Sequence, residues 1–241
     1  MGPVQGPVNP DQIGPDQIGP GPRLRSSYDL GQQVNDAPLI YVFEDFLGES
    51  ECAALIAAAQ GHLQRAVVSD AKSGAVSEGR TGQNAWVRHR HTPEIGALCD
   101  RISALVNLPL DQAESLQVIH YAETQEYRPH YDAWDGNTER GDRCMAQGGQ
   151  RLVTCLLYLN AVAAGGGTCF PKLDLEIRAI PGRMVLFHNC YPATSLRHPA
   201  SLHGGLPVLA GEKWACNLWF RERRYGPAPA VPKTSGFKRV I

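Results

Sequence analysis

The feature that most constrains this chain is a series of short β-branched and aromatic runs separated by Gly, Pro, Asn and Asp, from Leu116 to Arg221. No helical periodicity comes between the runs, which argues against a parallel sheet with crossover helices. The pattern predicts a mainly β sandwich or jelly roll with supporting helices. The predicted strands are 116–121, 127–132, 151–159, 167–170, 174–179, 183–188 and 213–221.

A helical support region precedes these strands, and it opens with the segment 38–43, which predicts one strand. The alanine-rich segment 51–60 predicts one helix, with Ser50 as the expected N-cap. Thr92 is the expected N-cap of a second helix, whose apolar residues recur at helical spacing. Both helices are expected to support the sheet. The predicted division is a helical support region over 37–115 and a jelly-roll core over 116–224, which together form one domain of residues 37–224.

Both ends of the chain differ in composition from this domain. Residues 1–36 are rich in Pro, Gly, Gln and Asp and contain Pro-Asp-Gln-Ile-Gly twice in tandem. Such a segment buries too little apolar area to offset the entropy of ordering, so we expect a flexible tail. The proline-containing stretch 225–241 is interpreted in the same way.

Two long polar connections interrupt the predicted strands, namely Trp134–Gln150 and Cys190–Gly205. Binding residues are often carried on loops that a rigid scaffold holds in place. We therefore expect both loops to lie at the mouth of a functional site.

Charge and cysteine content limit the kinds of binding partner and the cellular compartment to be expected. The 23 basic and 24 acidic residues give a net charge of −1, so charge provides no reason to expect nucleic acid or an anionic membrane. The seven cysteines are odd in number and lack C-x-x-C spacing, which favours a reducing cytoplasm. There is neither a secretory signal pattern nor an apolar run of about 18 residues. We expect a cytoplasmic protein that binds a small molecule or a peptide, and its oligomeric state stays open.

A possible metal site stands out within the β-rich half. His130 and Asp132 are two residues apart, so on a strand their side chains point to the same face. With His203, expected from the facing sheet, they supply two histidines and one carboxylate, which suits iron(II) with open coordination positions. Lys213 can hold an acidic co-substrate by its charge, and the Tyr121 hydroxyl can donate to the same carboxylate. The combination indicates an oxygenase.

Around these residues the chain resembles the prolyl 4-hydroxylases of the iron(II) and 2-oxoglutarate dependent dioxygenases, including collagen-type, plant, algal and bacterial members. The resemblance covers about Phe43 to Glu222. The segments that carry it, in order, are Gly79–Thr81, Leu116–Tyr121, Glu126–Asp132, Gly149–Asn160, Gly165–Pro171, Ser201–Val208 and Gly211–Trp219.

The resemblance implies a double-stranded β-helix and a role for each matched residue. His130, Asp132 and His203 would ligate iron. Lys213, Tyr121 and Thr168 would hold the far carboxylate of 2-oxoglutarate, and Tyr127, Arg151 and Trp219 would contact the peptidyl proline or its backbone. One departure concerns Gly167, because the family usually has a glutamate at the middle position of Gly166–Thr168.

The implied reaction is hydroxylation of a prolyl residue in a peptide or protein to 4-hydroxyproline. It would use Fe(II), 2-oxoglutarate, O2 and ascorbate, and would give succinate and CO2 as co-products. Two alternatives stay open: a hydroxylase of a free imino acid, amino acid or other small molecule, and a non-catalytic jelly-roll binding module. The Pro-Asp-Gln-Ile-Gly repeats also raise the hypothesis that the tail binds the groove or is itself modified, although a flexible leader is favoured.

Overall fold

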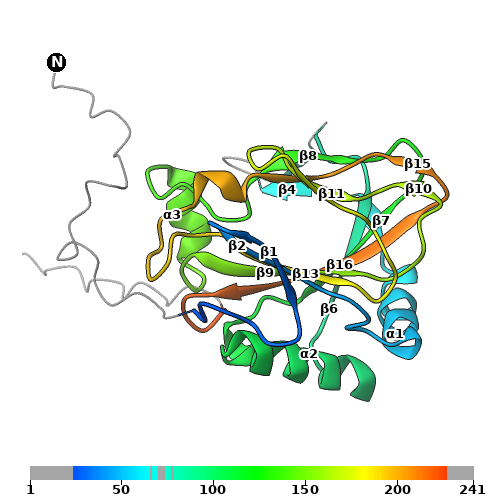
Figure 1. The fold of residues 1–241 in the computed structure, drawn as a ribbon, viewed down its shortest axis with the longest axis horizontal. Coiled ribbons are helices and arrows are strands. Elements are labelled where there is room, and N and C mark those ends of the chain that lie inside the picture. Colours follow the sequence, from blue (N-terminus) through cyan, green and yellow to red (C-terminus); the bar gives the residue numbers. More distant parts are fainter. Residues whose placement is uncertain (1–23, 66, 70–73, 77–78, 227–241) are drawn as a thin grey trace, which may run out of the picture.

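The structure is a computed structural model that describes residues 24–65, 67–69, 74–76 and 79–226. Two antiparallel sheets carry most of the fold (Figure 1). The larger sheet contains β1 (Gln32–Asp36), β2 (Leu39–Phe43), β3 (Gln64–Arg65), β6 (Gln83–Val87), β7 (Leu116–Tyr121), β9 (Arg151–Tyr158), β13 (Met184–His188) and β16 (Lys213–Arg221), in the order β1-β2-β13-β9-β16-β7-β6-β3. The smaller sheet contains β8 (Tyr127–His130), β11 (Thr168–Phe170), β12 (Leu175–Ile177) and β14 (His203–Gly205), in the order β12-β11-β14-β8.

The remaining elements are short strand pairs, helices and 3-10 turns. The strand pairs are β4 (Val67–Ser69) with β5 (Gly74–Val76) and β10 (Ala164–Gly165) with β15 (Val208–Ala210). The helices are α1 (Glu49–Gln60), α2 (Pro93–Val106) and α3 (Glu139–Met145), and the 3-10 turns are η3 (Leu110–Gln112) and η4 (Pro199–Ser201). No helix in the described ranges has the length and apolar character needed to cross a membrane.

The alternation of side chains along the strands builds two apolar layers. On β16, Cys216 and Leu218 join the core cluster that includes α1 and α2, whereas Ala215 joins the cluster between the two sheets. The same alternation directs Lys213 and Trp219 to the face that carries Ala215, because residues two apart on a strand share a face. The interior between the sheets therefore receives polar side chains at the positions where a site can form.

Most of the predicted architecture is confirmed. The chain is mainly β, its two antiparallel sheets form a jelly roll, and α1 and α2 support the larger sheet. The strand expected at 116–121 matches β7, and that at 213–221 matches β16. Thr92 caps α2 as expected, since its hydroxyl accepts a hydrogen bond from the Ile95 backbone N–H. The prediction of Ser50 as a cap is wrong, because α1 begins at Glu49 after the N-cap Gly48.

The predicted tail boundary at residue 36 is also wrong. Strand β1 pairs with β2 along an edge of the larger sheet. Before it, Tyr28 is buried and its hydroxyl lies 2.8 Å from His188 Nε2. A buried aromatic ring and an edge strand attach this segment to the core, although its overall composition is polar. The tail predictions for residues 1–23 and 227–241, and the hypothesis of tail modification, lie outside the described residues.

Three further predictions need correction. Strand β2 matches the strand expected at 38–43, but the region 37–115 also contributes β3 and β6 to the larger sheet, which were not expected. The loop Trp134–Gln150 contains the helix α3, whose first turn is capped by the Thr138 hydroxyl. The loop Cys190–Gly205 ends in η4 and β14, so His203 begins a strand rather than following a long irregular segment.

Candidate active site

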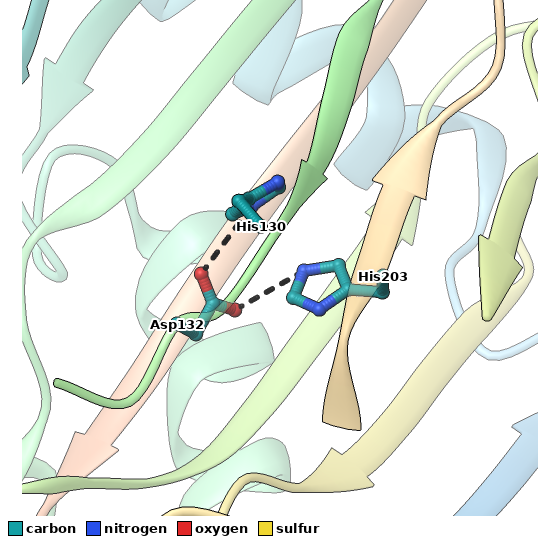
Figure 2. A group of neighbouring side chains, drawn as sticks. All are labelled: His130, Asp132 and His203. Atoms are coloured by element: carbon teal, nitrogen blue, oxygen red, sulfur yellow. Dashed lines mark ion pairs between the residues drawn. The ribbon is translucent and has the colours of Figure 1, made fainter. Parts of the chain in front are cut away.

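Three potential metal ligands meet at the end of the smaller sheet (Figure 2). His130 ends β8 and His203 begins β14, and the two residues are direct partners in the antiparallel register. Asp132 follows two residues after His130 and lies 3.7 Å from its Nε2 and 3.6 Å from His203 Nε2. The expectation that His203 comes from the facing sheet is wrong, since β14 pairs with β8 in the same sheet.

In both imidazoles Nε2 faces Asp132 and is the nitrogen available to a metal. The Nδ1 of His130 lies 3.0 Å from the Arg128 carbonyl oxygen, and the Nδ1 of His203 lies 2.9 Å from the Ser201 carbonyl oxygen. A carbonyl only accepts, so each Nδ1 carries a hydrogen, and in the neutral ring this tautomer leaves the lone pair on Nε2. Backbone carbonyls commonly fix metal-binding histidines in this way.

The Asp132 carboxylate is held from behind by two donors. Its Oδ2 accepts hydrogen bonds from Thr154 Oγ1 at 2.7 Å and from Trp219 Nε1 at 2.8 Å. Asn189 Nδ2 in turn donates to Thr154 Oγ1 at 2.9 Å, which leaves the Thr154 hydroxyl hydrogen to be given to Asp132. These bonds fix the carboxylate with its other oxygen facing His130.

The protonation states of the cluster suit a cation. Burial, together with the neighbouring His203, lowers the pKa of His130 to about 3, so its ring is neutral at pH 7. Burial raises the pKa of Asp132, but His203, His130 and Arg151 outweigh it and bring the pKa to about 2. One ionised carboxylate and two imidazoles are the donor set of the facial iron(II) site.

The spacing of these atoms also fits a metal ion. The three ligand atoms lie within 4.8 Å of one another. Two atoms that each bond a first-row metal at about 2.1 Å are separated by roughly 3–4 Å, depending on the angle between the bonds. The residues therefore fit the iron that the sequence predicts, and the opposite side of the cluster is left to other ligands.

Lys213 is the second charged centre of the interior. It begins β16, the residue is 3% exposed, and burial lowers the pKa of its ammonium to about 8. Among the described residues no carboxylate pairs with it, and its nearest aromatic neighbours are the rings of Tyr158 at 5.3 Å and Tyr121 at 5.9 Å. A buried cation without an internal anion is costly, so an external carboxylate would be stabilised here.

The other predicted co-substrate residues surround the same lysine. Tyr121 is the register partner of Lys213 on the neighbouring strand β7. Thr168 on β11 is buried, and its hydroxyl lies 2.7 Å from the Tyr158 hydroxyl. Tyr158 was not among the predicted residues. It lies in an apolar run where an ordinary core tyrosine is equally expected, so only the fold shows that it contacts Thr168.

Arg151 and Trp219 contact other side chains of the site. Arg151 makes a bidentate ion pair with the buried carboxylate of Glu114, through Nε at 2.6 Å and Nη2 at 2.8 Å. Its guanidinium lies 3.8 Å from the centre of the Trp219 ring, whose N–H is used by Asp132. Glu114 also lies 2.8 Å from Arg221 Nε. Contact of Arg151 and Trp219 with a substrate stays a prediction, and the structure shows them supporting Asp132.

Tyr127 packs directly on a metal ligand. Its ring is stacked on that of His130, with 3.6 Å between centroids and 20° between planes. The Arg80 guanidinium covers the Tyr127 ring at 4.7 Å from its centre. Arg80 belongs to the segment Gly79–Thr81 that resembles the prolyl 4-hydroxylases, but it was given no role there. The stack restrains rotation of the His130 ring, and contact of Tyr127 with a substrate stays a prediction.

The structure gives a physical reason for Gly167. A Cβ at this position would lie 2.8 Å from the Ile177 carbonyl oxygen of the neighbouring strand β12, which is too close. The same Cβ would lie 3.4 Å from Glu176 Oε1. A carboxylate from β12 is thus already beside the position where the family usually has its glutamate.

A groove opens beside the metal ligands. It has a volume of about 450 Å³ and extends from β8 to α3 and to the loop before η4. Its walls include Trp134 from one predicted long loop and Arg197 from the other, so both loops do lie at the mouth of the site. Tyr127 lines the groove, whereas Arg151 and Trp219 are not among its lining residues.

Fold and site together define a jelly-roll oxygenase with a two-histidine, one-carboxylate metal centre. The profile of the 2OG-Fe(II) oxygenase superfamily matches residues 116–221, which include the three ligands and Lys213. Prolyl 4-hydroxylase 5 of Arabidopsis thaliana is 34% identical over 211 residues, covering 78% of this chain and 70% of the relative. Prolyl 4-hydroxylase 2 of the same plant is 33% identical, covering 78% and 69%.

A solved structure agrees with these relatives. The viral collagen prolyl hydroxylase from Paramecium Bursaria Chlorella virus-1, in its complex with 2OG, superposes with a TM-score of 0.60 and 28% identity. The match covers 76% of this chain and 95% of the viral one. The chain belongs to the prolyl 4-hydroxylase family of the Fe(II)/2-oxoglutarate-dependent dioxygenases.

Proposed function

We propose that this enzyme hydroxylates a prolyl residue in a peptide or protein to 4-hydroxyproline, with 2-oxoglutarate and O2 as co-substrates and succinate and CO2 as co-products. The observation that carries the proposal is the groove, which begins at His130 and extends away from the metal ligands to α3. An extended peptide needs such a groove, whereas a small molecule needs an enclosed pocket. The family membership of the chain supports the same substrate class.

Each residue of the interior has a part in this reaction. Iron(II) bound by His130, Asp132 and His203 would activate O2 together with 2-oxoglutarate, so that an oxygen atom can be inserted into a C–H bond. The Lys213 ammonium would neutralise the far carboxylate of 2-oxoglutarate. The hydroxyls of Thr168 and Tyr121 would orient that carboxylate, and the apolar residues between the sheets would keep water out.

The small-molecule alternative is less well supported. A free imino or amino acid would need a cation for its carboxylate, and Arg151, whose Nη1 lies 3.9 Å from Asp132 Oδ1, is the candidate. Arg151 is already paired with Glu114 through two short hydrogen bonds, and a second carboxylate would compete with a buried partner. The binding-module alternative does not fit, because the full ligand set is present and correctly arranged.

The test is direct. The protein is incubated with iron(II), ascorbate and 2-oxoglutarate and a panel of proline-containing peptides and free imino acids. We expect succinate together with a +16 Da peptide product, and amino-acid analysis should identify 4-hydroxyproline. A +16 Da product on free imino acids alone would favour the small-molecule alternative, and no product on any substrate would refute the proposed function.

Two further expectations are carried as proposals. We propose that ascorbate sustains turnover, in keeping with the reaction class, and its omission from the assay tests this. We also propose a cytoplasmic location, supported by seven cysteines that are all free, five of them buried. Free thiols persist where the compartment is reducing. Imaging of a tagged full chain would check the location.

A further inference from the structure

The groove beside the metal ligands is rich in arginine, and we call it the arginine groove. Its lining residues are Gly79, Tyr127, Arg128, Pro129, His130, Tyr131, Ala133, Trp134, Asp135, Thr138, Arg140 and Arg197. Three of these are arginines and one is an acid. The whole chain carries a net charge of −1, so this concentration of positive charge is a local property of the groove.

Arg197 is held over the groove with donors to spare. Its guanidinium lies 4.2 Å from the centre of the Tyr131 ring, which supports one face of the group. Among the residues that the structure describes, the Arg197 guanidinium makes one hydrogen bond, a long contact of 3.5 Å to Asp135 Oδ2. A guanidinium has five N–H donors, and most of those of Arg197 are left for another acceptor.

Arg128 is placed similarly on the strand that carries His130. Its side chain is 66% exposed and lies 3.6 Å from Glu126, beyond good hydrogen-bond distance. Because β8 leads directly into the metal ligands, a chain bound along the groove would pass these arginines close to the reacting proline. Carboxylates are the protein groups that match a guanidinium in charge and geometry.

We propose that the arginine groove selects peptides with Asp or Glu close to the target proline. The inference rests on the proposed function and adds its substrate class: the enzyme acts on an acidic, proline-containing segment rather than on a neutral or basic proline repeat. Arg197 and Arg128 are the specificity-determining residues. Each ion pair between one of these arginines and a peptide carboxylate would lie near solvent. The preference for acidic peptides is therefore expected to be about tenfold in kcat/KM and to weaken as salt screens the charges.

The experiment compares sets of three peptides, and the members of a set differ at one position only. Each contains a single proline, and the residues from three before to three after it are replaced in turn by Glu, Gln or Lys. Product is measured by mass, and binding by anisotropy of labelled peptides with the Mn(II)-loaded protein and 2-oxoglutarate. At one or more positions we expect Glu to exceed Gln and Gln to exceed Lys, with the difference reduced in about 500 mM NaCl.

Charge-reversal variants test whether Arg197 and Arg128 cause the preference for acidic peptides. Arg197→Glu should lose the preference for Glu and gain one for Lys, and the exposed Arg128→Glu provides a second variant if the first folds poorly. Arg178→Glu is the matched control, because Arg178 directly follows β12 at the opposite edge of the smaller sheet from β8. It should keep the wild-type order.

The outcomes separate the two proposals. Hydroxylation with equal kcat/KM and equal binding for Glu, Gln and Lys at every position would overturn the inference and leave the proposed function standing. Preferential binding of acidic peptides without any hydroxylation would overturn the proposed function and keep the charge selectivity of the groove. A preference for Lys would overturn the inference outright.

Discussion

The two charged centres of the interior are built in opposite ways. At the metal end, Asp132 accepts hydrogen bonds from Thr154 and Trp219, and both histidines are oriented by backbone carbonyls. At the other end, Lys213 is buried without an anion in the described part of the chain. The first centre is completed by the protein itself, and the second is completed only when an anion arrives. The protein thus holds the three candidate metal ligands in place and leaves the Lys213 ammonium without a compensating anion among the described residues.

Removing a metal ligand should give the largest effect. His130→Ala is expected to abolish peptide hydroxylation and to weaken Mn(II) binding by more than about 100-fold, because one of three protein ligands is lost. Isothermal titration with Mn(II) and product mass would measure both losses.

His120→Gln is the matched control for that prediction. His120 pairs with Glu212 at 2.7 Å and packs on Trp214, which belongs to the core cluster shared with the helices. This variant should keep wild-type metal affinity. Retention of Mn(II) by His130→Ala would show that the metal is held elsewhere.

Replacing Lys213 should separate binding from stability. Lys213→Met is expected to weaken 2-oxoglutarate binding by about 100-fold, since it removes the charge proposed to neutralise the far carboxylate. In the absence of 2-oxoglutarate the same variant should be more stable by about 1–3 kcal/mol, because an apolar side chain replaces a buried, unpaired cation. Urea unfolding measures the gain in stability, and titration calorimetry measures the loss of 2-oxoglutarate affinity. A destabilised variant would contradict the view that Lys213 is a buried cation without an internal anion.

The donors behind Asp132 should matter less than the ligands themselves. Thr154→Val removes one hydrogen bond to Asp132 Oδ2 and is expected to lower Mn(II) affinity about tenfold, as changes behind metal ligands commonly do. Thr154→Ser keeps the hydroxyl and should restore the affinity. Equal metal binding by both variants would show that Trp219 alone is sufficient to hold Asp132.

The sequence predicts the ligands better than the residues that support them. His130 and Asp132 are neighbours in the chain, and their chemistry can be recognised from spacing alone. Thr154 on β9 of the larger sheet meets Asp132, which follows β8 of the smaller sheet, only once the two sheets face each other. Asn189 reaches Thr154 across 35 residues of sequence, and Glu114 meets Arg151 across 37. Thr154 did leave a signal, because it is the one hydrogen-bonding side chain in the apolar segment Leu152–Leu157.

For the fold too, features that depend on neighbouring residues are predicted better than those that depend on residues far apart in the sequence. Alternation within each strand predicts which face Lys213 and Trp219 occupy, and β7 and β16 match their predicted bounds. The sheet to which β14 belongs depends on its pairing with β8, and no local pattern determines that pairing. Tyr28 was missed because a single aromatic residue in a polar segment does not outweigh its composition, although the core buries it against His188.

The pH dependence of 2-oxoglutarate binding provides the smallest and sharpest test. Burial lowers the pKa of Lys213 to about 8, so the free protein carries the charge below that pH and loses it above. Affinity for 2-oxoglutarate should be level below pH 7 and fall about tenfold between pH 7 and pH 9, with proton uptake on binding at pH 9. Calorimetry in two buffers of different ionisation enthalpy would measure both quantities.

The free energy of unfolding should rise with pH, whereas the affinity for 2-oxoglutarate falls. The folded pKa of Lys213 lies below its unfolded value of about 10.4, so the contribution of this group to the free energy of unfolding is unfavourable below pH 8 and is relieved as pH rises toward 10. Lys213→Met should lack both trends. If 2-oxoglutarate affinity stayed constant to pH 9 in the wild type, Lys213 would already be paired in the free protein, and the contrast with Asp132 would fail.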